Sequence, residues 1–243
     1  NGTSFYEVNR KPEFNLDLIL SNNYICHLLV MQRELMQELG FRSSVDGAQD
    51  HDIILRAVDR MMGEDRHAAR RAKLPIAHIP KVLYHWRCYE GSTSENPESK
   101  RYAYEAGMRA VEDFLKAREY QADVVHPCHL GFFRVNYQPA LLSNRPDVAV
   151  VGGKLIGRHN RVEGGIYNEN REPLYLGLHK EYSGYMHRAS CQQEAYAVDV
   201  RCMICSGEAQ TVWEELTGLP YAVQPHTGYF LYQDVLKKDA DYE

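Results

Sequence analysis

The chain has 243 residues, of which 44% are hydrophobic and 25% charged, and these proportions exclude a disordered or collagen-like protein. Lys and Arg number 28 against 33 Asp and Glu, and the resulting net charge of −5 disfavours a dedicated nucleic-acid binder, which usually carries a basic face. The longest candidate apolar run, Leu16–Leu20, is far shorter than the roughly 18 residues that a membrane-spanning helix needs.

The first part of the chain predicts helices around one buried strand. We expect a short apolar turn or helix at Leu16–Leu20 and a buried strand at Asn23–Met31, because β-favouring apolar residues dominate the second segment. A helix over Gln32–Leu39 should stop at Gly40. Apolar residues recur at helical spacing in Asp50–Met62, and acidic residues at the start of this helix would lie at the positive end of its dipole.

The middle of the chain predicts strands, a loop and a long helix. Ile76–Pro80 and Val82–Arg87 have the composition of two short strands that meet at a proline. Tyr89–Pro97 is rich in Ser, Thr and Gly and is typical of a loop. Apolar side chains along one face of Lys100–Arg118 predict an amphipathic helix.

From about Ala122 the pattern changes, and short β segments interrupted by glycine prevail. Asp147–Ile156 is a β-run with a glycine break, and Arg161–Leu178 is a Gly-, Asn- and Tyr-rich hairpin region. Ala195–Cys205 predicts a further strand, and Gln210–Leu216 predicts a helix. This second block repeats the order of the first, a strand followed by a helix that ends in Glu-Leu-Gly or Glu-Leu-Thr-Gly. We therefore predict two related domains, residues 1–121 and 122–243.

Six cysteines are scattered along a chain that is too long to need disulfide bridges for stability, so we expect mainly free thiols in a reducing compartment. Cys202 and Cys205 have the spacing of a redox or zinc motif. Positions three apart face opposite sides of a strand, and no second Cys or His pair lies at ligand spacing nearby. A zinc site at this pair is therefore the weaker alternative. The cysteines are Cys26, Cys88, Cys128, Cys191, Cys202 and Cys205.

The segment Gly47–Arg56 carries the sharpest chemical signal. Asp50 stands at a predicted helix start, where backbone N–H groups and the helix dipole favour an ionised carboxylate. Such a group could take a proton from a hydroxyl. Its alternative role is that of an ordinary N-terminal cap, and Asp52 is expected to hold the helix start or a nearby arginine.

Five segments in order resemble the C-terminal half of family 2 glycosyltransferases of the GT-A fold, in the subgroup that builds bacterial surface polysaccharides such as rhamnose-containing glycans. The resemblance implies an α/β fold with a GT-A-type mixed sheet flanked by helices, present here as two incomplete halves. Residues 1–121 would be the acceptor and catalytic-base half of a first domain, and 122–243 part of a second. The resembling segments are 11–17, 21–27, 47–52, 78–87 and 91–94.

The same resemblance assigns the catalytic residues. Asp50 would be the general base that deprotonates the acceptor hydroxyl in an inverting displacement, and Gln49 would help to place a sugar. In the second block Asp239 falls at the position of the base. It follows Lys238 where the family has Glu or Gln, which is a departure from the family motif.

The resemblance also implies a donor site. His85 would bind a divalent metal, Mn²⁺ or Mg²⁺, and Trp86 and Arg87 would border the diphosphate, with Arg87 neutralising charge on the leaving group. Ser92 and Thr93 would belong to a loop that closes over the nucleotide. The alternatives are a structural histidine, a packed tryptophan and a solvated loop.

The predicted activity is transfer of a sugar from a UDP- or dTDP-sugar to a glycan or lipid-linked glycan acceptor, in the cytoplasm or at the inner face of the cell membrane. A full GT-A enzyme opens with a βαβ nucleotide-binding half that neither block contains, so we expect this chain alone to bind nucleotide sugars poorly. A non-catalytic carbohydrate-binding or scaffolding module is the alternative. A glycoside hydrolase is disfavoured because Asp50 and Asp52 share one helix start and cannot straddle a sugar.

Overall fold

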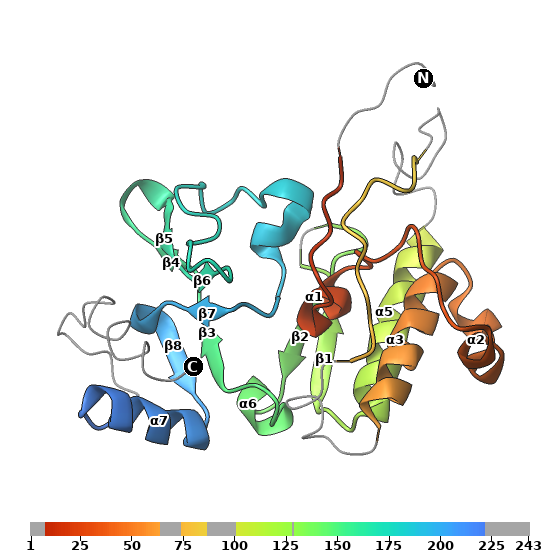
Figure 1. Ribbon diagram of the computed structural model, residues 1–243. Coiled ribbons are helices and arrows are strands. Elements are labelled where there is room, and N and C mark those ends of the chain that lie inside the picture. Colours follow the sequence, from red (N-terminus) through yellow and green to blue (C-terminus); the bar gives the residue numbers. More distant parts are fainter. Residues whose placement is uncertain (1–7, 64–73, 87–100, 128, 222–243) are drawn as a thin grey trace. The chain divides into compact units, whose positions relative to one another are not determined.

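The computed structural model describes residues 8–63, 74–86, 101–127 and 129–221 (Figure 1). The chain divides into two compact units, the first made of Asn1–Ala140 with Cys191–Glu194 and the second of Leu141–Ser190 with Ala195–Glu243. The described residues combine helices with short antiparallel strands, which is consistent with the predicted α/β class. The described strands form separate two-stranded sheets, where a mixed sheet was expected.

The first unit is built around two long helices and one antiparallel strand pair. Helix α5 packs on α3 and on strand β1, and β1 pairs with β2 in a register that sets Ala122 opposite Tyr137. Its elements are α1 (Leu16–Ser21), α2 (Arg33–Leu39), a 3-10 turn (Ser43–Val45), α3 (Gln49–Met62), α5 (Arg101–Ala117), β1 (Ala122–Val125) and β2 (Arg134–Tyr137).

The core of this unit is apolar and comes from these helices and strands. The predicted helices over Leu16–Leu20, Gln32–Leu39, Asp50–Met62 and Lys100–Arg118 are confirmed, with bounds that shift by one or two residues. Burying an aliphatic side chain contributes about 1.5–3 kcal/mol. The fully buried aliphatic side chains include Leu18, Ile19, Leu20, Ile53, Leu55, Val58, Val111 and Leu115.

The strand predicted at Asn23–Met31 is wrong. The segment has no strand pairing, and Leu28 and Val30 are exposed. A strand needs a neighbour to satisfy its backbone groups, but here the Lys11 ammonium donates hydrogen bonds to the carbonyls of Ile25 and His27 instead.

The two strands predicted at Ile76–Pro80 and Val82–Arg87 are also wrong for the described residues 74–86. These residues contain no helix or strand, and the side chains from Lys81 to Trp86 are exposed. The predicted loop at Tyr89–Pro97 lies outside the described residues.

The boundary between the two units lies after Ala140, whereas the sequence predicted a boundary after residue 121. Strands β1 and β2 stay with the first unit because β1 packs on α5 and pairs with β2. Gln192 explains why Cys191–Glu194 also joins it: its side chain accepts a hydrogen bond from the Val135 N–H at 2.8 Å and donates one to the Val135 carbonyl at 3.0 Å. That the units are halves of two related glycosyltransferase domains stays a prediction.

In its described residues, the second unit consists of short strand pairs, two helices and three 3-10 turns. The strand predicted over Ala195–Cys205 is split in two, because the Asp199 side chain accepts a hydrogen bond from the Arg201 N–H and turns the chain. Its elements are α6 (Leu141–Asn144), β3 (Val150–Gly152), β4 (Leu155–Ile156), β5 (Val162–Gly164), β6 (Ile166–Tyr167), β7 (Ala197–Val198), β8 (Met203–Cys205), α7 (Gly207–Thr217) and 3-10 turns at Arg158–Asn160, Tyr185–Ser190 and Val200–Cys202. The pairs are β3–β8, β4–β5 and β6–β7.

The helix predicted over Gln210–Leu216 is confirmed as α7, which begins after the capping residue Ser206 and ends at Gly218. Cys202 is exposed whereas Cys205 is buried, so the two thiols of the Cys-x-x-Cys sequence meet different surroundings. The described cysteines, Cys26, Cys191, Cys202 and Cys205, are free. None of the helices in the described residues combines the length and apolarity needed to cross a bilayer.

Asp199 makes the second unit sensitive to acid. Burial raises the pKa of this carboxyl group, but hydrogen bonds from Arg201 and from the Tyr167 hydroxyl outweigh burial, so the pKa is lowered overall. A lowered pKa means that the carboxylate stabilises the fold above its unfolded pKa of about 3.9 and that this stabilisation is lost as the pH falls through the folded value.

We therefore expect Asp199→Asn to destabilise this unit by about 2 kcal/mol at pH 7 and to have a smaller effect below about pH 4. Urea unfolding of the variant and the parent at pH 7 and pH 3 measures the difference. Glu215→Gln, at an exposed position on α7, is the matched control. An equal loss of stability at both pH values would contradict the prediction.

Candidate functional site

The turn that leads into α3 requires a glycine. Gly47 has a φ of +95°, and a Cβ atom placed there would lie 2.8 Å from the Cβ of Ala103 on α5. Any other residue would force the turn and α5 apart, so Gly47 lets the turn pack closely and fixes where α3 starts.

The three residues Asp50, His51 and Asp52 open α3 and enter three different environments. His51 is buried, and its Nε2 donates a hydrogen bond to the Ile19 carbonyl at 2.8 Å. Burial lowers the pKa of this imidazole, which is therefore neutral at pH 7. The ring packs on Phe133, with 6.1 Å between centroids. His51 thus ties the start of α3 to α1 and the core.

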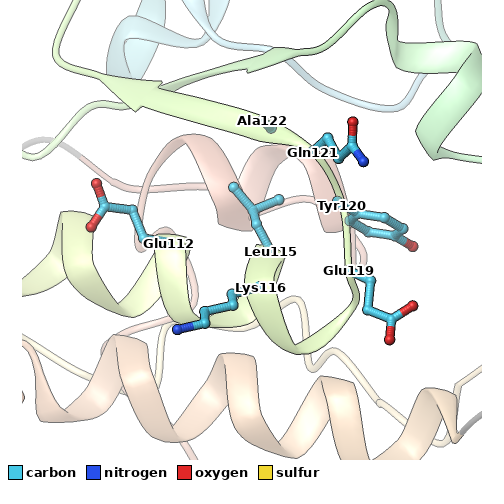
Figure 2. A pocket seen from close by; sticks show the side chains of 7 residues that line it. All are labelled: Glu112, Leu115, Lys116, Glu119, Tyr120, Gln121 and Ala122. Atoms are coloured by element: carbon cyan, nitrogen blue, oxygen red, sulfur yellow. The ribbon is translucent and has the colours of Figure 1, made fainter.

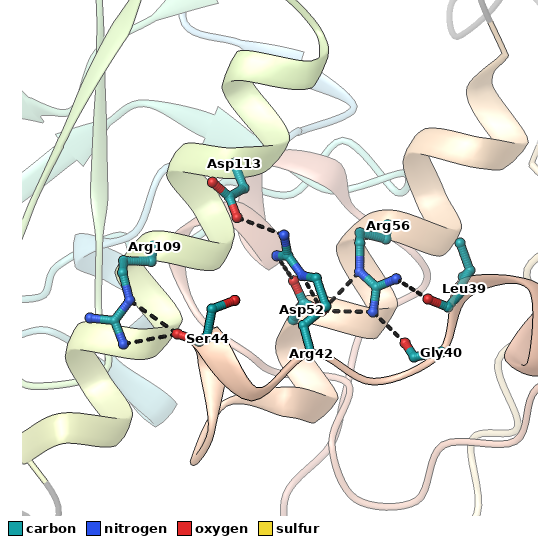
Figure 3. A network of polar contacts seen from close by, with 8 residues as sticks. All are labelled: Leu39, Gly40, Arg42, Ser44, Asp52, Arg56, Arg109 and Asp113. Carbon is teal, nitrogen blue, oxygen red and sulfur yellow. Dashed lines mark hydrogen bonds and ion pairs between the residues drawn. The ribbon is translucent and has the colours of Figure 1, made fainter.

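Asp52 is the centre of an ion-pair network, as the sequence predicted (Figure 3). Its side chain is 2% exposed and accepts hydrogen bonds from Arg42 and from Arg56, the latter at 2.8 Å. Arg42 also pairs with Asp113 of α5 at 2.9 Å. Arg56 also donates hydrogen bonds of 2.6 Å each to the carbonyls of Leu39 and Gly40. These carbonyls lie at the end of α2, where the helix itself provides no further N–H donors.

This network anchors α3 to its neighbours. Arg42 links Asp52 to α5, and Arg56 links it to the end of α2 (Figure 3). Asp52 therefore holds the first turn of α3 in place, and its fully paired carboxylate has no accessible face for a substrate.

Asp50 differs from both neighbours because it is only half-buried. Its Oδ1 accepts a hydrogen bond from the His51 N–H at 2.9 Å, and its Oδ2 accepts one from the Asn23 side-chain amide at 3.1 Å. The Cys26 thiol, whose pKa burial raises most, also feels the charge of this carboxylate. Asp50 thus combines partial exposure with a defined orientation.

The Cys26 thiol is protonated at neutral pH and can serve as a donor. Burial raises its pKa most, and the negative charge of Asp50 raises it further, while Lys11 lowers it. Cys26 Sγ also lies 3.0 Å from His27 Nδ1.

An aromatic cluster lies one residue along the chain from Cys26. The His27 ring stacks on Tyr84, with centroids 5.2 Å apart, and meets Trp86 edge-on at 4.9 Å. Trp86 is 55% exposed and Tyr84 45%. The segment that contains the predicted residue Trp86 is thereby brought next to the residues that hold Asp50.

The other predicted site residues are placed less clearly. Gln49 is exposed, and its side chain turns back to accept a hydrogen bond from the Gly47 N–H at 3.0 Å. His85 is exposed, and no group of three potential metal-binding side chains occurs in the described part of the chain, so these residues do not make a metal site around it. Its metal role stays a prediction. Arg87, Ser92, Thr93 and Asp239 lie outside the described residues.

A shallow pocket of about 420 Å³ lies elsewhere in the first unit (Figure 2). It is formed by the C-terminal end of α5 and the start of β1. Arg118, just after α5, reaches Asp59 and the Gly63 carbonyl near the end of α3, so this pocket lies about 20 Å along α3 from Asp50. The pocket and the candidate base are therefore separate. Its lining residues are Glu112, Leu115, Lys116, Glu119, Tyr120, Gln121 and Ala122.

Two curated proteins are similar to this chain. An uncharacterized protein, y4gI, from Sinorhizobium fredii is 44% identical over 106 residues, which are 43% of this chain and 11% of that protein. The O-antigen biosynthesis protein RfbC of Myxococcus xanthus is 30% identical over 142 residues, 58% of this chain and 10% of that protein. The matches thus span about a tenth of the length of these relatives. No protein-family model matches the chain, and no solved structure matches it significantly.

Proposed function

We propose that this chain is part of an inverting glycosyltransferase that acts in the synthesis of a cell-surface polysaccharide, and that Asp50 is its general base. The observation that carries the proposal is the geometry of Asp50: a half-buried carboxylate at a helix start, oriented by the Asn23 amide. The segment that supplies Asn23 also contains His27, which contacts the exposed Trp86 ring. The similarity to an O-antigen biosynthesis protein supports the same process. The proposal includes a GT-A-type fold of family 2, in the cytoplasm or at the inner face of the membrane.

The reaction follows from the position of this carboxylate. Asp50 accepts the proton of the acceptor hydroxyl while the hydroxyl oxygen attacks the anomeric carbon of the donor sugar. The bond from that carbon to the diphosphate breaks, the nucleoside diphosphate leaves with the bonding electron pair, and the configuration inverts. A carboxylate held by fixed donors needs little rearrangement to act, which lowers the cost of reaching the transition state.

The remaining assignments complete the proposal. The donor is a UDP- or dTDP-sugar and the acceptor a glycan or lipid-linked glycan, with Trp86 beside the substrate and Gln49, Arg87, Ser92 and Thr93 as further contacts. A divalent metal, Mn²⁺ or Mg²⁺, would neutralise diphosphate charge when bound, with His85 as the proposed ligand. Asp239 would have the role of base in the second unit.

A second candidate function is carbohydrate binding without catalysis. The exposed rings of Tyr84 and Trp86 favour it, because flat aromatic surfaces offer an apolar face to a sugar ring. This function would need the rings but not an ionised Asp50.

A donor screen tests the proposed function in the whole protein that contains this chain. UDP- and dTDP-sugars are offered one at a time with a glycan acceptor, and released nucleoside diphosphate is measured with Mn²⁺ and with a chelator. We expect one donor to yield acceptor-dependent release that the chelator reduces. Glycan binding without release from any donor would favour the carbohydrate-binding module.

A further inference from the structure

The orientation of Asp50 is set by residues outside its own helix. The Asn23 amide comes from the irregular segment after α1, 27 positions before Asp50, and donates a hydrogen bond to its carboxylate. Cys26 lies in the same segment, and the charge of Asp50 adds to the larger effect of burial in raising the pKa of its thiol. The carbonyls of Ile25 and His27 in this segment are held in turn by Lys11. The segment is therefore fixed against the start of α3 even though it forms no helix or strand.

We propose that Asn23 is a positioning residue that holds the Asp50 carboxylate at one angle and leaves an oxygen lone pair open to the acceptor hydroxyl. A carboxylate offers about four lone-pair sites on its two oxygens. The His51 N–H and the Asn23 amide occupy two of them. This inference rests on the proposed role of Asp50 as general base.

A buried oxygen on Asn23 supports this role. Asn23 Oδ1 is buried without a hydrogen-bond partner in the described part of the chain, an arrangement that costs stability. The amide group opposite, Nδ2, makes the bond to Asp50. The hydrogen bond to Asp50 therefore explains why an asparagine stands here, because an apolar residue would fill the space without burying a polar atom.

The charges around Asp50 define what a substitution should do. Cys26 faces it from the segment after α1, Lys11 acts on Cys26 from the N-terminal segment, and His51 and Asp52 follow on α3. His51 is buried and neutral, and Asp52 is neutralised by two arginines. A new carboxylate at position 23 would therefore be the one unpaired negative group in contact with Asp50.

The first experiment measures thiol chemistry and needs no substrate. Asp50→Asn removes the charge that raises the pKa of Cys26, so Cys26 should react with iodoacetamide about three- to tenfold faster at pH 8.5, followed by peptide mass spectrometry. Exposed Cys202 in the same sample is the internal control and should not change. An unchanged rate at Cys26 would overturn the contact, whether or not the protein is an enzyme.

The second experiment measures the pH dependence of transfer in the whole protein. In Asn23→Asp the two adjacent carboxylates resist ionising together, so the acid limb of kcat/KM should move up by about one pH unit or more. Asn22→Asp is the matched control, since the Asn22 amide bonds to the Gly131 carbonyl and not to Asp50. An acid limb that coincides with that of the control would overturn the proposal.

Two further Asn23 variants keep the test decisive if Asn23→Asp fails to fold. Asn23→Ala should lower kcat about three- to tenfold with little change in KM, and Asn23→Ser, which keeps a donor, should restore part of it. Equal kcat values for the two variants would overturn the positioning role of Asn23. Accelerated labelling of Cys26 in a protein with no transferase activity would instead keep the geometry and refute the proposed function.

Discussion

Asp50→Asn is expected to lower turnover by about a hundred- to ten-thousandfold while the protein stays folded, because asparagine keeps the shape of the side chain but cannot accept the proton of the acceptor hydroxyl. The side-chain hydrogen bonds of His51 and Asp52 do not involve Asp50, and asparagine keeps an oxygen that can accept from the His51 N–H, so the start of α3 should keep its structure. Initial rates of nucleoside diphosphate release with the best donor measure the loss, and circular dichroism and urea unfolding verify the fold.

Asp46→Asn is the matched control for this prediction. Asp46 is exposed in the turn just before α3, so the same chemical change four residues away should leave turnover within about twofold. Full turnover of Asp50→Asn would remove Asp50 as the base. If Asp50→Asn kept glycan binding but the parent also showed no turnover, the carbohydrate-binding alternative would gain support.

Asp52→Asn should show the opposite profile, a large loss of stability of about 2–3 kcal/mol. The amide cannot pair with two guanidinium groups, and its NH₂ group would face one of them. Arg42 and Arg56 are each partly exposed and regain water, which places the loss at the lower end of the range for a broken buried pair. Urea unfolding monitored by circular dichroism measures the change.

The control for Asp52→Asn lies on the same pair of helices. Glu38 of α2 pairs with Arg60 of α3 at 2.8 Å, but both side chains are more than half exposed. Solvent screens such a pair, so Glu38→Gln should leave the free energy of unfolding almost unchanged. If the two variants lost equal stability, the network around Asp52 would not be the anchor that its geometry indicates.

Helices were the part of the fold that could be predicted from sequence. The apolar spacing in Asp50–Met62 and Lys100–Arg118 repeats every three to four residues, and it found α3 and α5 because that period is a local property of the chain. Glycines marked the ends of α2 and α7 for the same reason.

Strands were predicted less well, since a strand exists only with a partner. Asn23–Met31 has β-favouring residues, but Lys11 takes the carbonyls that a neighbouring strand would have used. Composition contains no information about that competitor, which lies 14 and 16 residues away from Ile25 and His27. The strand over Ala195–Cys205 was split by the Asp199 side chain in a similar way.

The sequence by itself determined that Asp50 opens a helix. It also indicated that Asp52 holds the helix start or a nearby arginine and that the residues around them resemble a glycosyltransferase motif, because each of these is a property of a short stretch of chain. Only the tertiary structure decided which side chains surround Asp50. Asn23 and Cys26 approach it from another segment, and Trp86 lies near them through its contact with His27. Such contacts depend on how α1 packs on the start of α3 through buried His51, and side-chain packing between distant segments is not encoded in any local pattern.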